Sequence, residues 1–304
     1  MPDRSALADL LGDLLALTTF PAPGTRLRCG VSGGADSLAL LALGVAAGCE
    51  VTAVHVDHGQ REGSGEEVEL VATAAAQIGA ALETARVEVE PGPNLEARLR
   101  AARYAVLGAT AATGHTADDQ AETMLINLMR GAGLVGLGAM QPGPRRPILS
   151  LRRQDTQAVC ARLGWTPFVD PSNSDPSFVR NRVRHELRPL LDDIAGRDVT
   201  PLLTRSADHM RSTADVIDRL ADDVDPTDAR VIAGQPEPVA VRALQRWIRD
   251  ALGEPHPIDT ASLQRVLAVA RGEVQATEVT GGIRVYRSRQ RLHAEQIEAG
   301  PPSD

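Results

Sequence analysis

The stretch "CGVSGGADSLALLAL", Cys29 to Leu43, joins a short apolar run to a longer, helix-like apolar run through a polar loop. Gly33 and Gly34 lack a Cβ, so the backbone there can take positive φ and approach a ligand closely. Ser32 and Ser37 add hydroxyl donors, and a helix beginning near Ser37 offers unpaired N–H groups at its positive dipole end. The loop therefore predicts an oxyanion cradle, with a plain strand-to-helix turn as the alternative.

Asp36 lies inside this loop and would repel a bare phosphate. A carboxylate in such a place makes sense where Mg²⁺ bridges it to a polyphosphate, or where it caps the following helix. We therefore expect Asp36 to be a magnesium ligand, with helix capping as the alternative.

Short β-branched apolar runs alternate with helical stretches between about residues 26 and 114. This alternation predicts an α/β fold with a doubly wound, mostly parallel sheet that carries helices on both faces. Ligands of such sheets lie beyond the carboxyl ends of the strands. The predicted strands cover 27–31, 50–58 and 85–89, and the predicted helices cover 37–48, 66–79 and 94–109.

The composition changes after residue 130, where Gly and Pro crowd into a loop and an Arg-rich segment follows. We predict a first domain over 1–192 that includes the Arg-rich segment, and a smaller domain over 193–304. Apolar residues at three-to-four spacing make the second domain mainly helical. It ends in a predicted hairpin that turns at Gly281 and Gly282.

Composition narrows the possible classes of protein. The 304 residues contain no apolar run near the roughly 20 residues that span a bilayer. Three separated cysteines form no C-x-x-C motif, so we expect a soluble, cytoplasmic protein with no membrane partner and no disulfide framework. The net charge is −8, and all 32 basic residues are Arg, which excludes a Walker A lysine and requires any nucleic-acid contact to be a local basic patch.

Five ordered segments together resemble the tRNA(Ile)-lysidine synthases, which belong to the PP-loop superfamily of N-type ATP pyrophosphatases. They are "VSGGADSLALL", "VHVDHGQR", "PNLEARLRAARY", "GHTADDQAETMLINLMRGAGLVGL" and "DPSNSDPSFVRNRVRHELRPLL", between about residues 26 and 191. The resemblance implies that ATP, with Mg²⁺, is held by Ser32, Gly33, Gly34, Ala35, Asp36 and Ser37. It also implies L-lysine and tRNA(Ile) with a CAU anticodon as partners. Lysine would be ligated to C2 of the wobble cytidine through an adenylated intermediate.

The segment "GHTADDQAET" carries a carboxylate pair, Asp119 and Glu122. Residues three apart share one face of a helix, and paired carboxylates suit a substrate with two ammonium groups. The resemblance implies that this pair binds lysine. Thr116 also stands three residues before Asp119, which is the spacing of a capping box, so a purely structural role at the start of a helix over 118–130 is the alternative.

Four further residues are expected close to the nucleotide or the chemistry: Asp57, His58, Arg103 and His115. His115 follows a predicted strand and could donate to phosphate, although a lone histidine is more often only packed. For Asp57 and His58, merely ending a strand is an equally good explanation. Arg103 could be an ordinary solvated arginine, and only the resemblance favours a role for it near the reacting phosphate or tRNA.

A cluster of arginines follows at Arg180, Arg182, Arg184 and Arg188. In an acidic chain, guanidinium groups suited to bidentate phosphate contact predict a tRNA-binding surface, against the alternative of a solvated helix face. Further arginines extend this predicted track: Arg145, Arg146, Arg152, Arg153, Arg284, Arg287, Arg289 and Arg291.

Two other functions remain as alternatives. A tRNA thiolase of the same superfamily would need paired cysteines, and here Cys29 and Cys49 fall on separate predicted elements. A non-catalytic adenine-nucleotide-binding module would need neither the carboxylate pair nor the arginines. The oligomeric state, including a homodimer, stays open.

Overall fold

The computed structural model describes residues 4–57, 64–87, 89, 92, 95–252, 258–279 and 282–297. For residues 4–6, 64, 95–97 and 252 it describes the backbone alone. The chain divides into two compact units, Met1–His209 and Met210–Asp304. The division falls inside helix α10 (Thr200–Asp222), later than the boundary at residue 192 that the change of composition predicts. A continuous helix carries the chain from one unit into the next, so the sequence shows no linker there.

Unit 1 is built on four parallel strands in the order β3-β2-β1-β4. The central strands β1 (Arg26–Gly30) and β2 (Glu50–Asp57) lie close to their predicted positions. The edge strand β3 covers Ala81–Arg86, earlier than the predicted 85–89, and β4 is only Ala112–Thr113. The predicted α/β class with a parallel sheet is confirmed.

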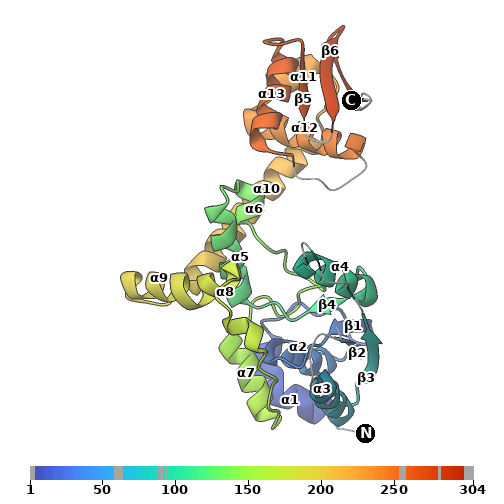
Figure 1. Ribbon diagram of the computed structural model, residues 1–304, viewed down its shortest axis with the longest axis vertical. Coiled ribbons are helices and arrows are strands. Elements are labelled where there is room, and N and C mark those ends of the chain that lie inside the picture. The colour runs from blue at the N-terminus through green and yellow to red at the C-terminus, as the bar shows by residue number, and fades with distance from the viewer. Residues whose placement is uncertain are drawn as a thin grey trace. The chain divides into compact units, whose positions relative to one another are not determined.

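Helices cover both faces of this sheet (Figure 1). One face packs on a core shared by α1 (Arg4–Leu15), α2 (Ala35–Ala46), α3 (Ser64–Ile78) and α7 (Arg153–Arg162). The other face packs on α4 (Leu95–Leu107). The alternation of strand side chains explains this, since Ala53 joins the first core while Val54 packs with Leu107 and Ala111.

A second helical group in unit 1 is formed by elements that follow β4 and precede α10 in the sequence. It contains α5 (Ala117–Met129), α6 (Leu134–Leu137) and the 3₁₀ turn Pro171–Ser174. A continuous helical run then passes through α8 (Val179–Arg182), a π-helical turn over Val183–Leu187 and α9 (Arg188–Ala195). Leu125 and Ile126 of α5 pack on Val183, which fixes the Arg-rich run against α5.

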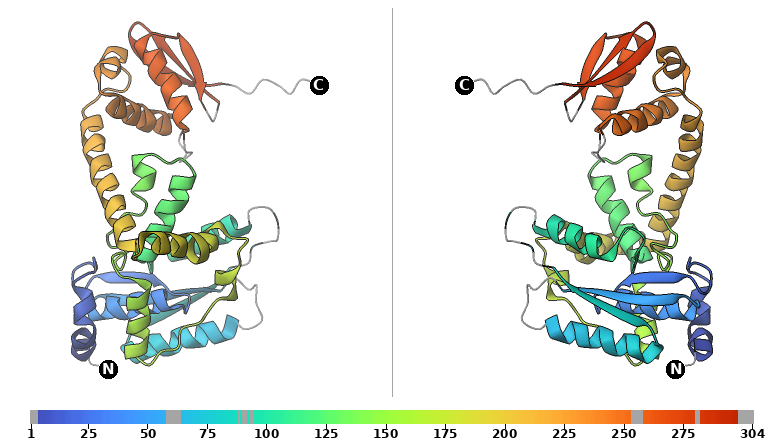
Figure 2. Two further views of the ribbon diagram at one scale, coloured as in Figure 1. Left: turned by 90° about the vertical axis from the view of Figure 1, so that its left-hand side faces the viewer. Right: turned by 90° about the vertical axis from the view of Figure 1, so that its right-hand side faces the viewer.

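Unit 2 contains the end of α10, then α11 (Ala229–Gly234), α12 (Glu237–Leu252) and α13 (Thr260–Arg271). A three-stranded antiparallel sheet, β5 (Ala276–Val279), β6 (Ile283–Ser288) and β7 (Arg291–Gln296), packs on α13 (Figure 2). β5 and β6 form the antiparallel pair expected of the predicted hairpin, with Gly282 at φ +70° and Gly281 outside the described residues. Strand β7 was not predicted. Among the helices that the structure describes, none has the length and apolar character to cross a membrane.

Candidate active site

The loops that follow β1 and β4 meet at the point where the order of the strands reverses. β1 pairs with β2 on one side and with β4 on the other, which makes this edge a topological switch point. Gly114, directly after β4, lies so close that a Cβ there would be 2.6 Å from the carbonyl oxygen of Asp36. Only glycine fits, so the two loops form one surface at the carboxyl ends of the strands.

The loop after β1 has the geometry of an anion cradle. Gly33 takes φ +82°, whereas Gly34 is extended and serves as the N-cap of α2, so only the first glycine uses its conformational freedom. The Ser32 N–H donates to Ser37 Oγ at 3.1 Å, and the Ser37 hydroxyl donates to the Gly34 carbonyl at 2.8 Å. These bonds hold the loop open at the start of α2, where the helix leaves its first N–H groups for a ligand.

Asp36 lies in the first turn of α2, and its carboxylate faces α7. Its Oδ1 accepts a hydrogen bond of 2.5 Å from the Thr156 hydroxyl, and its Oδ2 is 3.7 Å from Arg153 Nε. Burial raises the pKa of Asp36 to about 6, while the Thr156 hydrogen bond acts in the opposite direction. Because Gly34 is the N-cap, helix capping does not explain this carboxylate.

The surroundings of Asp36 suit a magnesium ion that is shared with a polyphosphate. Oδ2 lies beyond hydrogen-bond distance of Arg153, which leaves it available to a cation. No group of three metal-ligating side chains occurs among the described residues. Mg²⁺ normally needs only one or two carboxylates when phosphate oxygens and water complete its shell.

Asp119, the first member of the carboxylate pair on α5, uses its two carboxylate oxygens differently. Asp119 Oδ2 accepts from the backbone N–H and the hydroxyl of Thr116, each at 2.9 Å, which closes the predicted capping box. Asp119 Oδ1 instead faces Arg153 at 3.1 Å and Arg184 at 3.4 Å. One carboxylate oxygen starts the helix while the other points into the site.

Glu122 is fully buried and meets the same two arginines. It accepts from Arg153 at 3.3 Å and from Arg184 at 2.8 Å and 3.1 Å. Burial would raise the pKa of Asp119, but the charge of Arg153 and the Thr116 N–H outweigh it and lower that pKa. The face of α5 that carries Asp119 and Glu122 therefore holds two guanidinium groups, and Arg153 also contacts Asp36.

A neighbouring cluster is built on Asp118, which the sequence did not single out. Its carboxylate accepts from Arg152 Nε at 3.0 Å, from the Arg153 N–H at 2.9 Å and from Arg188 at 2.5 Å. Arg152 also pairs with Asp198 at 2.5 Å. The cluster joins the start of α5 and the N-cap of α7 to α9. Among the contacts of the described residues, none runs from the side chains of Asp118, Arg152 or Arg188 to Asp36.

The four arginines predicted to bind tRNA occupy different surroundings. Arg184 and Arg188 are paired with Glu122 and Asp118 in the interior. Arg180 donates to the Thr123 hydroxyl at 3.1 Å, and its side chain is 42% exposed. Arg182 is largely exposed and pairs with Glu186 one turn later. Arg180 and Arg182 are thus the members that can reach a large ligand.

The other predicted site residues lie at varying distances from the loop. His115 follows β4, and its Nδ1 is 2.7 Å from the Thr113 hydroxyl. Burial, together with the charges of Arg146, Arg180 and Arg100, lowers the pKa of His115 to about 4, so the imidazole is neutral at pH 7.

Asp57 ends β2, and His58 is outside the described residues. Arg103 lies on α4 with its guanidinium carbon 5.7 Å from the Tyr104 ring centre.

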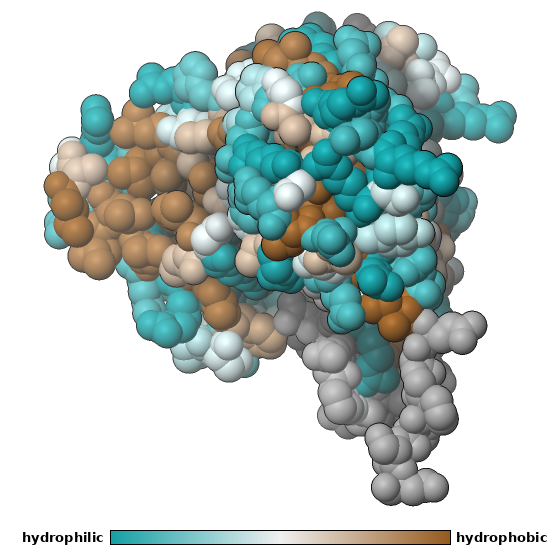
Figure 3. All heavy atoms as spheres, turned by 90° about the horizontal axis from the view of Figure 1, so that it is seen from above, coloured by the Kyte–Doolittle hydropathy of each residue, from teal (hydrophilic) through white to brown (hydrophobic). Residues whose placement is uncertain are grey.

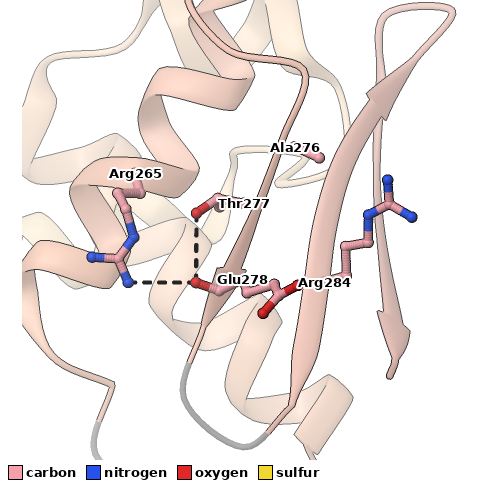
Figure 4. Close-up of a pocket in the computed structure, with 5 residues that line it drawn as sticks. All are labelled: Arg265, Ala276, Thr277, Glu278 and Arg284. Atoms are coloured by element: carbon pink, nitrogen blue, oxygen red, sulfur yellow. Dashed lines mark hydrogen bonds between the residues drawn. The ribbon is translucent and has the colours of Figure 1, made fainter. Parts of the chain in front are cut away.

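A shallow depression of about 430 Å³ lies in unit 2, lined by Arg265, Ala276, Thr277, Glu278 and Arg284 (Figure 4). Arg265 donates to the Glu278 carbonyl at 3.4 Å, and Arg284 lies 3.5 Å from Glu295. Figure 4 shows Arg284 pointing away from Arg265. The two arginines of the depression therefore do not point toward one ligand. The depression lacks the cluster of paired carboxylates and guanidinium groups found around Asp36.

The three cysteines of the chain, Cys29, Cys49 and Cys160, are free and buried. Burial raises the pKa of each thiol, that of Cys160 to about 11. Reactive cysteines need the opposite shift and some exposure. The thiols therefore offer no support for sulfur transfer.

Comparison with known proteins identifies a domain family and relatives that cover most of the chain. A PP-loop domain family matches residues 8–191. The tRNA(Ile)-lysidine synthase of Nocardia farcinica is 40% identical over 76% of this chain and 78% of its own. That of Rhodococcus jostii is 36% identical over 82% and 81%.

Among solved structures, the U34-tRNA thiolase of Methanococcus maripaludis, a protein with a [4Fe-4S] cluster, superposes with a TM-score of 0.50. It is 15% identical and covers 67% of this chain and 78% of its own, which supports the fold alone. The PP-loop family implies the use of ATP. From its curated relatives and its PP-loop domain, the chain belongs to the tRNA(Ile)-lysidine synthase family.

Proposed function

We propose that the protein ligates L-lysine to C2 of the wobble cytidine in the CAU anticodon of tRNA(Ile), using ATP. Such a change turns an AUG-reading, methionine-type anticodon into an AUA-reading isoleucine one. The observation that carries the proposal is the Asp119–Glu122 pair, which opens toward the ATP loop and is joined to Asp36 by a single guanidinium.

In the first step, the cytidine O2 attacks the α-phosphorus of ATP and pyrophosphate leaves. The backbone of residues 32–37 and the hydroxyls of Ser32 and Ser37 hold the phosphates in this proposal. Mg²⁺ bound through Asp36 would neutralise charge that develops on the phosphate. The neutral imidazole of His115 and the predicted cation of Arg103 would help to orient the nucleotide.

In the second step, an amine of lysine attacks C2, AMP leaves and one proton is lost. The attacking amine must be neutral, so one carboxylate of the pair accepts its proton while the other can hold the second ammonium. Asp119 is suited to remain an anion, since its pKa lies below the ordinary value. Positioning both substrates beside the loop is the main contribution of the protein.

Contact with tRNA is proposed for the four predicted arginines, with Arg180 and Arg182 at the surface. Arg184 and Arg188 would contribute positive charge from below the surface, because Glu122 and Asp118 hold their guanidinium groups. The described arginines of the β6–β7 hairpin, Arg284, Arg287, Arg289 and Arg291, would add contacts from unit 2 to the same ligand. Of these, Arg284 and Arg291 form ion pairs with Glu295 and Asp225.

Self-association also stays a proposal. Five large apolar side chains of unit 1 are more than half exposed on α5, α6 and α9: Leu128, Met129, Val135, Leu190 and Ile194. Figure 3 shows a broad hydrophobic region on the side of the view toward which α9 projects in Figure 1. A homodimer would bury apolar surface of this kind.

The test is the formation of AMP from ATP by purified protein, with lysine and tRNA(Ile) transcript each added or omitted. We expect AMP only when both are present, and Asp36→Ala should abolish it. AMP formed with tRNA and a sulfur donor but without lysine would favour the thiolase alternative. No AMP under any condition would favour a nucleotide-binding module.

A further inference from the structure

Arg153 is the one described side chain that contacts carboxylates of both subsites. Its Nη2 is 3.1 Å from Asp119 Oδ1 and 3.3 Å from Glu122 Oε1, while its Nε is 3.7 Å from Asp36 Oδ2. A guanidinium thus stands where the proposed function places a substrate ammonium. Its side chain is 22% exposed, so it lies inside the site and not on its rim.

The charges in the site already balance without a ligand. Asp36, Asp119 and Glu122 face the guanidinium groups of Arg153, Arg184 and, at 3.9 Å, Arg180. An ammonium that enters adds a fourth cation to three buried or half-buried carboxylates. Burying an excess charge is costly, so one of the guanidinium groups must move when lysine binds.

Arg153 is the group best placed to move. Arg184 grips Glu122 through two nitrogens at 2.8 Å and 3.1 Å, whereas the contacts of Arg153 with the pair are 3.1 Å to 3.3 Å. Arg153 also has a second partner, Asp36, inside the ATP loop. Phosphates bound at that loop would add negative charge near this second partner of Arg153.

We infer that Arg153 is a positioning residue that couples the two subsites: it occupies the carboxylate pair in the free protein and turns toward the loop when nucleotide binds. This inference rests on the proposed function and adds an order of binding to it, because bound nucleotide would free the carboxylate pair for lysine. By linkage, lysine must strengthen nucleotide binding by the same factor.

The test is calorimetric titration of L-lysine into the full chain, with and without Mg²⁺ and an ATP analogue carrying a methylene group between the α- and β-phosphates. In the unaltered protein we expect the analogue to tighten lysine binding about tenfold. In Arg153→Met, lysine should bind without nucleotide about as tightly as it does with nucleotide in the unaltered protein, and the analogue should change its affinity less than about twofold.

Arg152→Met is the matched control, because this neighbouring arginine holds Asp118 and Asp198 but not the pair. Its coupling factor should equal that of the unaltered protein even if its stability falls. If Arg153→Met does not fold, Arg153→Lys takes its place, since a point charge cannot span three carboxylates, and its coupling should fall below about threefold.

Two results would count against the inference in different ways. Equal coupling in the unaltered protein and in the Arg153 variants, or no coupling in the unaltered protein, overturns the role of Arg153 and leaves the lysine site intact. Failure of lysine to bind any folded variant with or without nucleotide overturns the lysine assignment itself, and the coupling with it.

Discussion

Two ion-pair clusters of unit 1 are built on adjacent residues of α5, Asp118 and Asp119. Each includes one of two adjacent arginines at the start of α7, the N-cap Arg152 or the first helical residue Arg153. The Asp118 cluster is closed, because its partners Arg152 and Arg188 tie three helices together. The Asp119 cluster is open toward the ATP loop through the contact with Asp36. Similar residues therefore tie helices together in one cluster and face the loop after β1 in the other.

The largest effect should separate these two aspartates. Asp119→Asn removes a charged partner of the proposed ammonium, so lysine-dependent AMP formation should fall by about 100-fold or more. Asp118→Asn should keep the lysine dependence of the unaltered protein and instead lose about 3 kcal/mol of unfolding free energy, because it removes the charged partner of Arg188 and leaves Arg152 with Asp198. Steady-state kinetics at low temperature and chemical denaturation of both variants measure this difference. The comparison fails if the two variants lose lysine dependence equally.

The close approach between the loop after β1 and the loop after β4 depends on Gly114. A Cβ at this position would be 2.6 Å from the Asp36 carbonyl oxygen and 3.0 Å from the Ser37 nitrogen, and neither backbone atom can move freely. Gly114→Ala should weaken ATP binding about 30-fold by shifting the loop. Gly12→Ala is the control, because nothing lies within 4 Å of a Cβ there, and its ATP affinity should not change. Unaltered affinity in Gly114→Ala would show that the loop does not need this close approach.

The Asp118 cluster should appear in the acid unfolding of the protein. Burial would raise the pKa of Asp118, but the hydrogen bonds of Arg152 and Arg153 lower it from 3.8 to about 2. A lowered pKa stabilises the folded state above the ordinary value, and this contribution, about 2 kcal/mol, is lost as the pH falls from about 4 toward 2. Denaturation followed from pH 6 to pH 2 should show this loss, and Asp118→Asn should lack it. An identical pH dependence in both proteins would contradict the assignment.

The smallest effect is expected at the surface of the Arg-rich run. Arg182 is 62% exposed and forms an ion pair with Glu186 one turn later on the surface, so Arg182→Ala should change stability by less than about 0.5 kcal/mol. Its affinity for tRNA should fall about twofold, with a salt dependence shallower by about one charge. Glu186→Ala frees the same guanidinium and should not weaken tRNA binding. Filter binding at several salt concentrations distinguishes these outcomes.

The sequence predicts the parts of the fold whose signal is local. The buried apolar runs of β1 and β2 and the capping box at Thr116 all lie where the pattern predicts them. Strand β3 is displaced because it is an edge strand whose side chains are mostly exposed, so its segment "ALETAR" lacks the apolar run that marks a buried strand.

The sequence could not predict which arginine meets which carboxylate. Arg152 is 34 residues from Asp118, and Arg184 is 62 residues from Glu122. Such pairs depend on how α5, α7 and the Arg-rich run pack, and not on spacing along one helix. Charge alone therefore placed Arg152 and Arg153 on a tRNA track, while the structure gives them to two different carboxylate clusters.

The most direct measurement of the central claim is the covalent transfer of isotope-labelled lysine to a tRNA(Ile) transcript, located by mass spectrometry of its nuclease fragments. We predict one label, on the wobble cytidine, that requires ATP, persists in Asp118→Asn and is lost in the folded double variant Asp119→Asn, Glu122→Gln. Labelling that survives in the double variant, or that falls on another nucleotide, would contradict the assignment of this carboxylate pair to lysine.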